Sequence, residues 1–431
     1  MLSGFKKRES KKITPKVFFD NVLHNASCDV NNSSLNSLCI EMKESCKVEI
    51  TKQGLDERYT EKAPQFLKSV LGELCFSNEI PIDEGWLGYF NSMRIKDSTK
   101  FVLPEEYAVK LPGFGGVSSK SAACIQYEYD IKTGTILDLN ITPANKPDSK
   151  DARETQNNIK PNDLVIRDLG YYSIDVFVQF ISAGAFLISK LNTQTLVYEM
   201  KDLHYVQLDF KKLYHRMEKS NLSRIEKQVY IGAEAKLPVR IIIDLVPEEV
   251  FNKRMQKVNK YNKRMGFATS DNYADRARFN LIITNIPVKI IPAPAIVALY
   301  HVRWQIELVF KIWKSIFKVH EIKKMKYHRW LCILYAKLIL ISIFWQAIMP
   351  IRSYLYKEKG RLLSIDKCFK TLKGKTAQLR AELKKEKIEQ LMLWILKLLS
   401  EKHWLEKKKN KLNFEQIIYS NYCKSDIYVY I

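Results

Sequence analysis

The stretch DLVIRDLGYYSIDVFVQFISAG, residues 163–184, holds a short apolar run followed directly by a helical pattern. Leu164 to Ile166 are apolar, as in a buried strand, and Gly170 marks a turn just after them. Beyond Ser173 the apolar residues recur at the spacing of one helix face. The stretch therefore predicts a buried β-strand that leads into a helix, a building unit of α/β sheets.

Three more strands are predicted before this unit. RIKDSTKFVL (94–103) alternates and is rich in β-forming residues, while SAACIQYEYD (121–130) and TGTILDLNIT (133–142) are apolar runs with a hairpin signal between them. Three strands of antiparallel character, then a fourth strand and a helix, are the opening order of a ribonuclease H-like α/β domain. We therefore predict an α/β fold with a ribonuclease H-like core.

The next segment, from 185 to about 290, has further β-like runs around a basic helical piece, EEVFNKRMQKVNKYNKRM (248–265). It is predicted to be a β-rich insertion. A last core helix should begin near Pro292 or Pro294, since proline is tolerated in a first turn, and run through Phe317. The predicted organisation is a helical region at 1–85, a ribonuclease H-like core at 86–320 with its insertion at about 185–290, and a basic helical region at 321–431. In the helical region a polar break, TKQG (51–54), would suit either a helix-turn-helix that contacts DNA ends or a plain helical bundle.

The positive charge is concentrated in the last part of the chain. The net charge is +23, and residues 301–431 contribute +17 of it, with 28 Lys or Arg against 11 Asp or Glu. The first 300 residues therefore carry only +6. A basic surface confined to one region suits a phosphate backbone. The alternative is a solvated, lysine-rich surface with no partner.

Two features bear on the compartment. The eight cysteines form no C-x-x-C pair and no zinc-ligand spacing, which indicates a reducing, cytosolic environment. Residues 330–350 are almost wholly apolar and long enough to span a bilayer. Lys337 and Gln346 interrupt this run, and a helix buried on all sides of a globular protein has the same composition. A membrane protein anchored by 330–350 is kept as an alternative.

A polar stripe marks the predicted last core helix. Tyr300, Arg303, Glu307 and Lys314 stand at i, i+3, i+7 and i+14, so on one helix they share a face. Such a face packs poorly in a core, because buried charges need partners. It would suit a phosphate site, with a carboxylate for a metal and cations for oxygens. The alternative is an exposed face with an Arg303–Glu307 pair.

Two aspartates lie on the predicted core strands. Asp97 interrupts an apolar strand, where propensity and burial disfavour it. Asp168 closes the strand that precedes Gly170, and carboxylates at such ends face the crevice where α/β sheets bind ligands. Solvation at a strand edge would also explain each of them. Asp148 and Asp151 stand in a polar connection and are predicted to be solvated.

The spacing Tyr300-x2-Arg303-x3-Glu307-x6-Lys314 matches, at every position, the Y-R-E-K signature of a known family. The chain resembles the insertion-sequence transposases of the IS-four family. DST at Asp97 looks like that family's first aspartate motif, DLGYYS at Asp168 like its second, and LIITNIP like the strand before its glutamate helix. The order of aspartate, aspartate, long β insertion and glutamate is similar too.

The resemblance implies a metal-dependent DDE transposase that cuts the ends of an insertion sequence and joins them to target DNA. Its partners would be double-stranded DNA, as terminal inverted repeats and target, and a second copy of the chain on paired ends. It would be a cytoplasmic, nucleoid-associated bacterial protein without a membrane anchor. The cofactor would be two magnesium ions, with manganese as a substitute, because hard oxygen ligands select these metals.

The resemblance also assigns roles to residues. Asp97, Asp168 and Glu307 would be catalytic and would hold the metals, with Asp97 bridging both ions. Tyr300, Arg303 and Lys314 would bind DNA phosphates. An alternative is a catalytically inactive DNA-binding protein derived from a transposase, although all three carboxylates are intact.

The chain departs from its relatives at two points. Some relatives hold a flipped base with a tryptophan in the insertion, and here no tryptophan lies between Trp86 and Trp304, so that role is left unassigned. Relatives often carry arginine near the position of Lys190, which leaves a phosphate contact there open.

Overall fold

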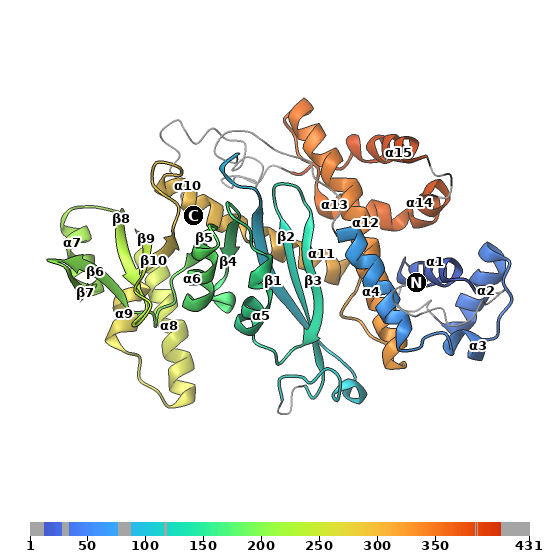
Figure 1. The fold of residues 1–431 in the computed structure, drawn as a ribbon, viewed down its shortest axis with the longest axis horizontal. Coiled ribbons are helices and arrows are strands. Elements are labelled where there is room, and N and C mark those ends of the chain that lie inside the picture. Colours follow the sequence, from blue (N-terminus) through green and yellow to red (C-terminus); the bar gives the residue numbers. More distant parts are fainter. Residues whose placement is uncertain are drawn as a thin grey trace. The chain divides into compact units, whose positions relative to one another are not determined.

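The computed structural model describes residues 13–27, 34–75, 88–115, 119–383, 385 and 387–406. These residues form two compact units. Figure 1 shows their helices and strands. The described part of the first unit comes from Met1–Pro81, Ser98–Asn145 and Ile306–Lys411, and that of the second from Ile82–Asp97 and Lys146–Gln305. The chain passes from the second unit to the first directly after Asp97 and again directly after Gln305. Both points lie within the predicted catalytic motifs.

Parallel strands form the centre of the second unit. β1 (Met93–Val102) begins in this unit and pairs in parallel with β4 (Leu164–Arg167), which pairs in parallel with β5 (Phe186–Lys190). α6 (Ile174–Ser182) follows β4, as the DLVIRD stretch predicted, and its buried side chains Val176, Phe177 and Phe180 pack in the core of the unit. Residues buried on both faces explain why β4 is almost continuously apolar.

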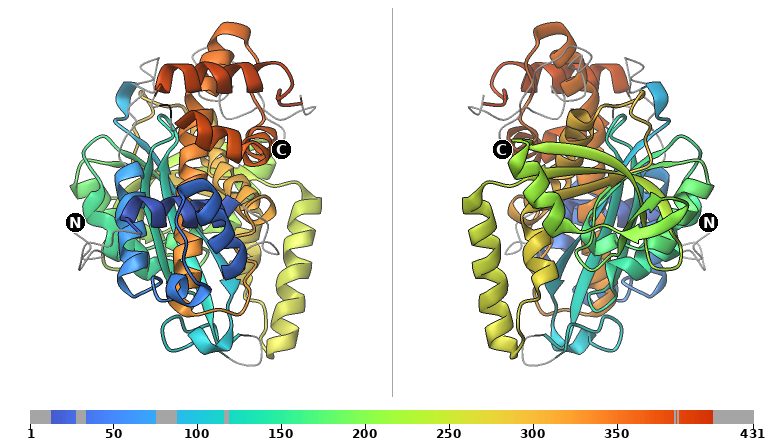
Figure 2. Two further views of the ribbon diagram at one scale, coloured as in Figure 1. Left: turned by 90° about the vertical axis from the view of Figure 1, so that its right-hand side faces the viewer. Right: turned by 90° about the vertical axis from the view of Figure 1, so that its left-hand side faces the viewer.

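The β-rich segment extends this sheet with antiparallel strands, in the order β5-β10-β9-β8-β6-β7. Its first predicted run is β5 itself, so the added strands start after Lys190. The basic piece at 248–265 forms α8, which lies beside α9 of the same unit (Figure 2). The added elements are β6 (Val197–Lys201), β7 (His204–Gln207), α7 (Phe210–Lys219), β8 (Arg224–Ile231), β9 (Leu237–Leu245), α8 (Glu248–Met265), α9 (Asp271–Ala277) and β10 (Phe279–Thr284).

The first unit combines a hairpin with helices. Its strands are ordered β3-β2-β1, with β1 divided between the two units. The predicted hairpin is β2 (Ala122–Asp130) with β3 (Ile136–Pro143). Its helices are α1 (Pro15–Ser27), α2 (Leu35–Cys46), α3 (Lys52–Asp56), α4 (Lys62–Cys75), α11 (Gln305–Ser315), α12 (Tyr327–Lys359), α13 (Ile365–Gly374), α14 (Thr376–Leu383) and α15 (Ile388–Ser400). Ten strands and flanking helices in the described chain confirm the predicted mixed α/β class.

The apolar run at 330–350 lies inside α12. By length and composition this is the one helix in the described ranges that could cross a membrane, yet 72% of its most apolar window is buried within the protein. α1 and α4 pack against it. Lys337 is buried on this helix and donates to the Lys318 carbonyl at 2.8 Å, while burial lowers the pKa of its ammonium to about 8. A helix covered in this way fits the interpretation of residues 330–350 as a buried core helix rather than a membrane span.

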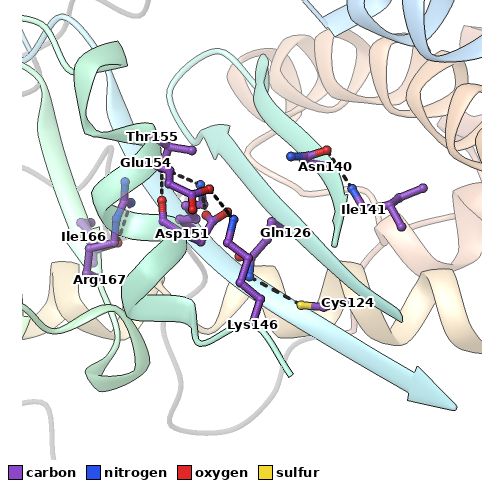
Figure 3. A network of polar contacts seen from close by, with 11 residues as sticks. Cys124, Gln126, Asn140, Ile141, Lys146, Asp151, Glu154, Thr155, Ile166 and Arg167 are labelled. Carbon is purple, nitrogen blue, oxygen red and sulfur yellow. Dashed lines mark hydrogen bonds and ion pairs between the residues drawn. The ribbon is translucent and has the colours of Figure 1, made fainter. Parts of the chain in front are cut away.

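A buried ion-pair network joins β1 to α5 (Asp148–Thr155) in the second unit. The Nζ atom of Lys96 lies 2.7 Å from Asp151 Oδ2, and the two side chains are 0% and 1% exposed. Lys146 contacts Asp151 at 3.3 Å and Glu154 at 2.6 Å (Figure 3). The prediction that Asp151 is solvated is therefore wrong. The sequence signal was misleading because its partner, Lys96, lies far away in the chain.

Candidate active site

Asp97 and Asp168 are brought level with each other by the pairing of β1 and β4. The parallel register joins Ile95 to Ile166, and two residues further along each strand come the two aspartates. Asp168 follows the last residue of β4 and sits at the start of a short 3-10 turn. The parallel pairing of β1 and β4 thus places two carboxylates, predicted separately from sequence, next to each other, although β1 itself continues to Val102.

Lys190 continues the same row. β4 and β5 pair in parallel with Arg167 opposite Ser189, so the next residue on each strand puts Lys190 level with Asp168. Burial lowers the pKa of the Lys190 ammonium, and the negative charge of Asp168 opposes this shift. The sequence alone assigns no role to Lys190. Its signal was the same as that of Asp168, namely a charge at the end of a buried strand.

Tyr300 and Arg303 approach the two aspartates from the end of α10 (Ala293–Val302). The Tyr300 hydroxyl donates to Asp168 Oδ1 at 3.1 Å. Arg303 Nη1 donates to Asp97 Oδ2 at 3.2 Å, and its Nε lies 3.9 Å from Asp168 Oδ1. One guanidinium group therefore contacts both carboxylates, a geometry in which the rigid planar fork of arginine is favoured over lysine.

The position of α10 is set by contacts within the second unit. Its N-cap is Pro292, with a further proline in the first turn, as the sequence predicted. The buried Arg240 of β9 donates to the carbonyl oxygens of Ile286 at 3.4 Å and Ile291 at 2.8 Å, and it pairs with Glu226. These bonds fix the segment that leads from β10 into α10. The helix end that carries Tyr300 is therefore tied to the sheet that carries the aspartates.

The ring of Tyr300 is buried in this site. Burial and the neighbouring Asp168 charge raise the pKa of its hydroxyl well above the ordinary range, so it is protonated at neutral pH and serves as a hydrogen-bond donor. The Lys190 ammonium lies 5.4 Å from the centre of the ring. Asp168 thus has a neutral donor, a guanidinium and an ammonium around it. A phosphate that approaches this carboxylate would have to bind through the two cations.

Glu307 and Lys314 lie on a second helix. The prediction of one helix from the prolines to Phe317 is wrong, because the chain makes a turn at Arg303 and Trp304, where their amides bond three residues back. α11 then starts at Gln305, with Glu307 in its first turn and Lys314 in its last. The four signature residues therefore do not share one continuous helical stripe.

α11 is held in the first unit by its aromatic side. Trp313 packs against Tyr127 of β2 with ring centres 4.9 Å apart, and Phe310 adds to the same cluster. Glu307 is exposed, and Lys314 donates to the Lys100 carbonyl at 3.5 Å. The structure thus brings together Asp97, Asp168, Tyr300 and Arg303 in the second unit, while the joint action of Glu307 with them stays a prediction.

Comparison with known proteins decides the family. The family described as Transposase DDE domain matches residues 89–343, more than half of the chain. The transposase for insertion sequence element IS231E of Bacillus thuringiensis subsp. finitimus is 31% identical, over 78% of this chain and 73% of the relative. The transposase for IS1151 of Clostridium perfringens is 28% identical over the same shares. The chain belongs to the DDE transposase family.

Family membership confirms the resemblance drawn from the Y-R-E-K spacing. The relatives are IS231 and IS1151 transposases, of the IS-four type. The DDE transposase domain is ribonuclease H-like, which confirms the core predicted from the strand order. Enzymes of the DDE family cut and join DNA. The matched range contains both aspartates, Glu307 and the Tyr300 and Arg303 pair.

The two aspartates of this DDE domain fit a divalent metal. They offer hard carboxylate oxygens, the ligands that magnesium and manganese prefer. They also already share a cationic partner, because Arg303 contacts both. No group of three or more His, Cys, Asp or Glu side chains with the geometry of a metal site occurs in the described ranges. Of the three predicted metal ligands, the two that the structure brings together are the aspartates.

Removing the Tyr300 hydroxyl should weaken the site without unfolding it. Tyr300→Phe keeps the buried ring but takes away the donor that orients Asp168. Loss of an outer hydrogen bond to a metal ligand typically costs about 10–100-fold in metal affinity or activity. We expect end cleavage to need more magnesium and to slow by that factor.

The matched control for this prediction is Tyr214→Phe. Tyr214 also donates its hydroxyl to a carboxylate, that of Glu218 at 3.0 Å, but does so on α7. Cleavage by this control should equal that of the parent at all magnesium concentrations. Equal magnesium dependence of Tyr300→Phe and the parent would show that Tyr300 does not orient Asp168.

Proposed function

We propose that the chain is an active insertion-sequence transposase that cuts the ends of its element and joins them to target DNA by phosphoryl transfer. The observation that carries the proposal is the pair Asp97 and Asp168, placed side by side on parallel strands and held by one arginine. Membership of the DDE family supports it. An exposed, solvated pair of aspartates would not need a buried tyrosine donor and a guanidinium as partners.

In this proposal Asp97, Asp168 and Glu307 would hold two magnesium ions, or manganese in their place. Bound there, such ions polarise the phosphate and favour a deprotonated nucleophile at neutral pH. Arg303, Tyr300 and Lys314 would bind backbone oxygens of the DNA. Arg303 and Lys314 also offset the charge that develops on the phosphoryl group, since fixed donors in a site act without reorganisation.

The partners follow from the reaction. The substrate is double-stranded DNA, in the form of the element's terminal repeats and of a target. Two ends must be cut together, so we propose a homodimer on paired ends. An insertion-sequence transposase acts on DNA in the bacterial cytoplasm. The concentration of positive charge in residues 301–431 supports a phosphate footprint in that part of the chain.

The test is cleavage and strand transfer on linear duplexes that carry the element's own ends. We expect both products with magnesium and neither with excess chelator. Asp168→Asn should remove both, by roughly 10³-fold or more, while retaining end binding. Asp175→Asn, an exposed aspartate in the first turn of α6, is the matched control and should act like the parent. Specific binding of the ends by the parent without cleavage would instead assign the chain to the catalytically inactive alternative.

A further inference from the structure

The basic helix α8 carries none of the signature residues of the site described above. It spans 18 residues, Glu248–Met265, and none of its residues is buried. Its two acidic residues stand in the first turn, and Glu248 pairs with Arg278 of the same unit at 3.5 Å. From Val250 to Ser270 the sequence then contains six Lys or Arg and no Asp or Glu. All charged side chains in the last four turns are thus basic.

The cations are arranged as a stripe. Lys253, Lys257, Lys260 and Arg264 follow one another at steps of four, three and four residues, and all four side chains are exposed. These steps keep them on one face of a helix. The stripe spans roughly 16 Å, at about 1.5 Å per residue. Among the described residues none of these four side chains forms an ion pair with a carboxylate.

The opposite face of α8 is tied to its own unit. Arg254 donates to the carbonyls of Ala277 at 2.9 Å and Phe279 at 2.8 Å, and to Asn280. The Phe251 ring lies 4.0 Å from the Arg278 guanidinium. The partly buried residues Met255 and Val258 are on this side as well. The helix is therefore anchored through one face and presents the cationic stripe on the other.

Like charges at this spacing destabilise an isolated helix, because neighbouring cations repel one another. A bound polyanion would reverse that effect, because each cation would then meet a phosphate. Two exposed aromatic side chains stand beside the end of the stripe, Tyr261 at 52% and Phe267 at 66% exposed. Basic and aromatic groups together are typical of nucleic-acid surfaces. A membrane surface would need a free apolar face, and the apolar face of α8 is turned to its own unit.

We propose that the stripe Lys253, Lys257, Lys260 and Arg264 binds the phosphate backbone of duplex DNA. This inference deepens the proposed function and rests on it, since it names a surface that holds the DNA substrate outside the carboxylate site. Backbone contacts position a protein on the duplex and carry no sequence information. The contribution of α8 is therefore the same for an element end and for a duplex of random sequence.

The test compares two quadruple variants of the full chain. The first replaces the stripe by glutamine, as Lys253→Gln, Lys257→Gln, Lys260→Gln and Arg264→Gln. The matched control removes the same charge from the other exposed basic helix of this unit, α7, as Lys211→Gln, Lys212→Gln, Arg216→Gln and Lys219→Gln. Affinity for an end duplex and a random duplex is measured over a salt series.

Four lost phosphate contacts should reduce the slope of log affinity against log salt by about 3 to 4. The affinity at low salt should fall roughly 10-fold or more, equally for both duplexes. The α7 variant should change the slope by less than about 1. A triple variant Lys253→Arg, Lys257→Arg and Lys260→Arg, which keeps the charge, should retain the parental slope.

The outcomes separate this inference from the proposed function. Equal slopes for the α8 variant and the parent, in a protein that cleaves ends, would overturn the inference alone. Equal losses in the α8 and α7 variants would also overturn it, since they would show an effect of total charge. A parent that binds duplex through α8 but cleaves no ends with magnesium would contradict the proposed function and leave the inference supported.

Discussion

Glu307→Gln should abolish end cleavage, by roughly 10³-fold or more, while end binding stays within a few-fold of the parent. Glutamine keeps the size of the side chain and removes the negative charge that a divalent metal requires. Glu307 is exposed in the first turn of α11, so the change should leave the fold intact. Cleavage of labelled end duplexes in magnesium, with binding measured in calcium, gives the two readouts.

The control for this variant is Glu321→Gln. Glu321 lies in the same unit and forms an exposed i,i+3 pair with Lys318 at 3.6 Å, an interaction of little energetic weight. The Glu321→Gln variant should cleave end duplexes at the same rate as the parent. Parental cleavage by Glu307→Gln would remove Glu307 from the mechanism and leave the aspartate pair as the only carboxylates of the site. Loss of binding as well as cleavage would show that Glu307 acts in holding DNA.

The sequence predicted the elements of the core but not the tertiary pairs that surround the site. The strands at 94–103 and 163–168 and the hairpin were found from alternation and apolar runs, which are local signals. The register that sets Asp168 level with Asp97 and Lys190 arises from the pairing of distant strands. Local signals therefore assign no role to Lys190, although it continues the row of the two aspartates.

The single helix predicted after the prolines failed for a related reason. Tyr300, Arg303, Glu307 and Lys314 have helical spacing, and the intervening residues include no glycine or proline that would indicate a break. The turn at Arg303 and Trp304 nevertheless separates α10 from α11. Arg303 is drawn to the two aspartates and the Trp313 side of α11 packs on β2. Tertiary contacts of this kind override local propensity.

Lys96→Met should destabilise the protein by about 3–5 kcal/mol. It leaves Asp151 as a charge that is 1% exposed, and breaking one side of a buried ion pair typically costs this much. The Lys96 ammonium also donates to Thr155 at 3.0 Å, so a second bond is lost. Chemical denaturation, with the midpoint and slope recorded for each variant, measures the effect. A loss below about 1 kcal/mol would show that Asp151 is satisfied without Lys96.

Lys146→Met is the matched control, because it removes the other ammonium that contacts Asp151. Its side chain is 15% exposed and also pairs with Glu154, which is 51% exposed. Partial exposure lets water replace a lost partner, so we expect a loss of about 1 kcal/mol or less. The two lysines thus differ in burial rather than in chemistry, and each variant leaves Asp151 with the other lysine. The difference between the variants therefore measures how burial changes the cost of losing one partner of Asp151.

The double variant Lys96→Met with Asp151→Leu tests why the pair is present. An apolar pair of similar volume is often as stable as a buried ion pair, so most of the lost stability should return. Lys96 directly precedes Asp97 on β1, and its bond to α5 limits how that strand can shift. If the double variant is stable but cleaves more slowly than the parent, the ion pair serves to hold Asp97 in register with Asp168. If the double variant cleaves like the parent, the strand pairing alone is sufficient to hold Asp97 in register with Asp168.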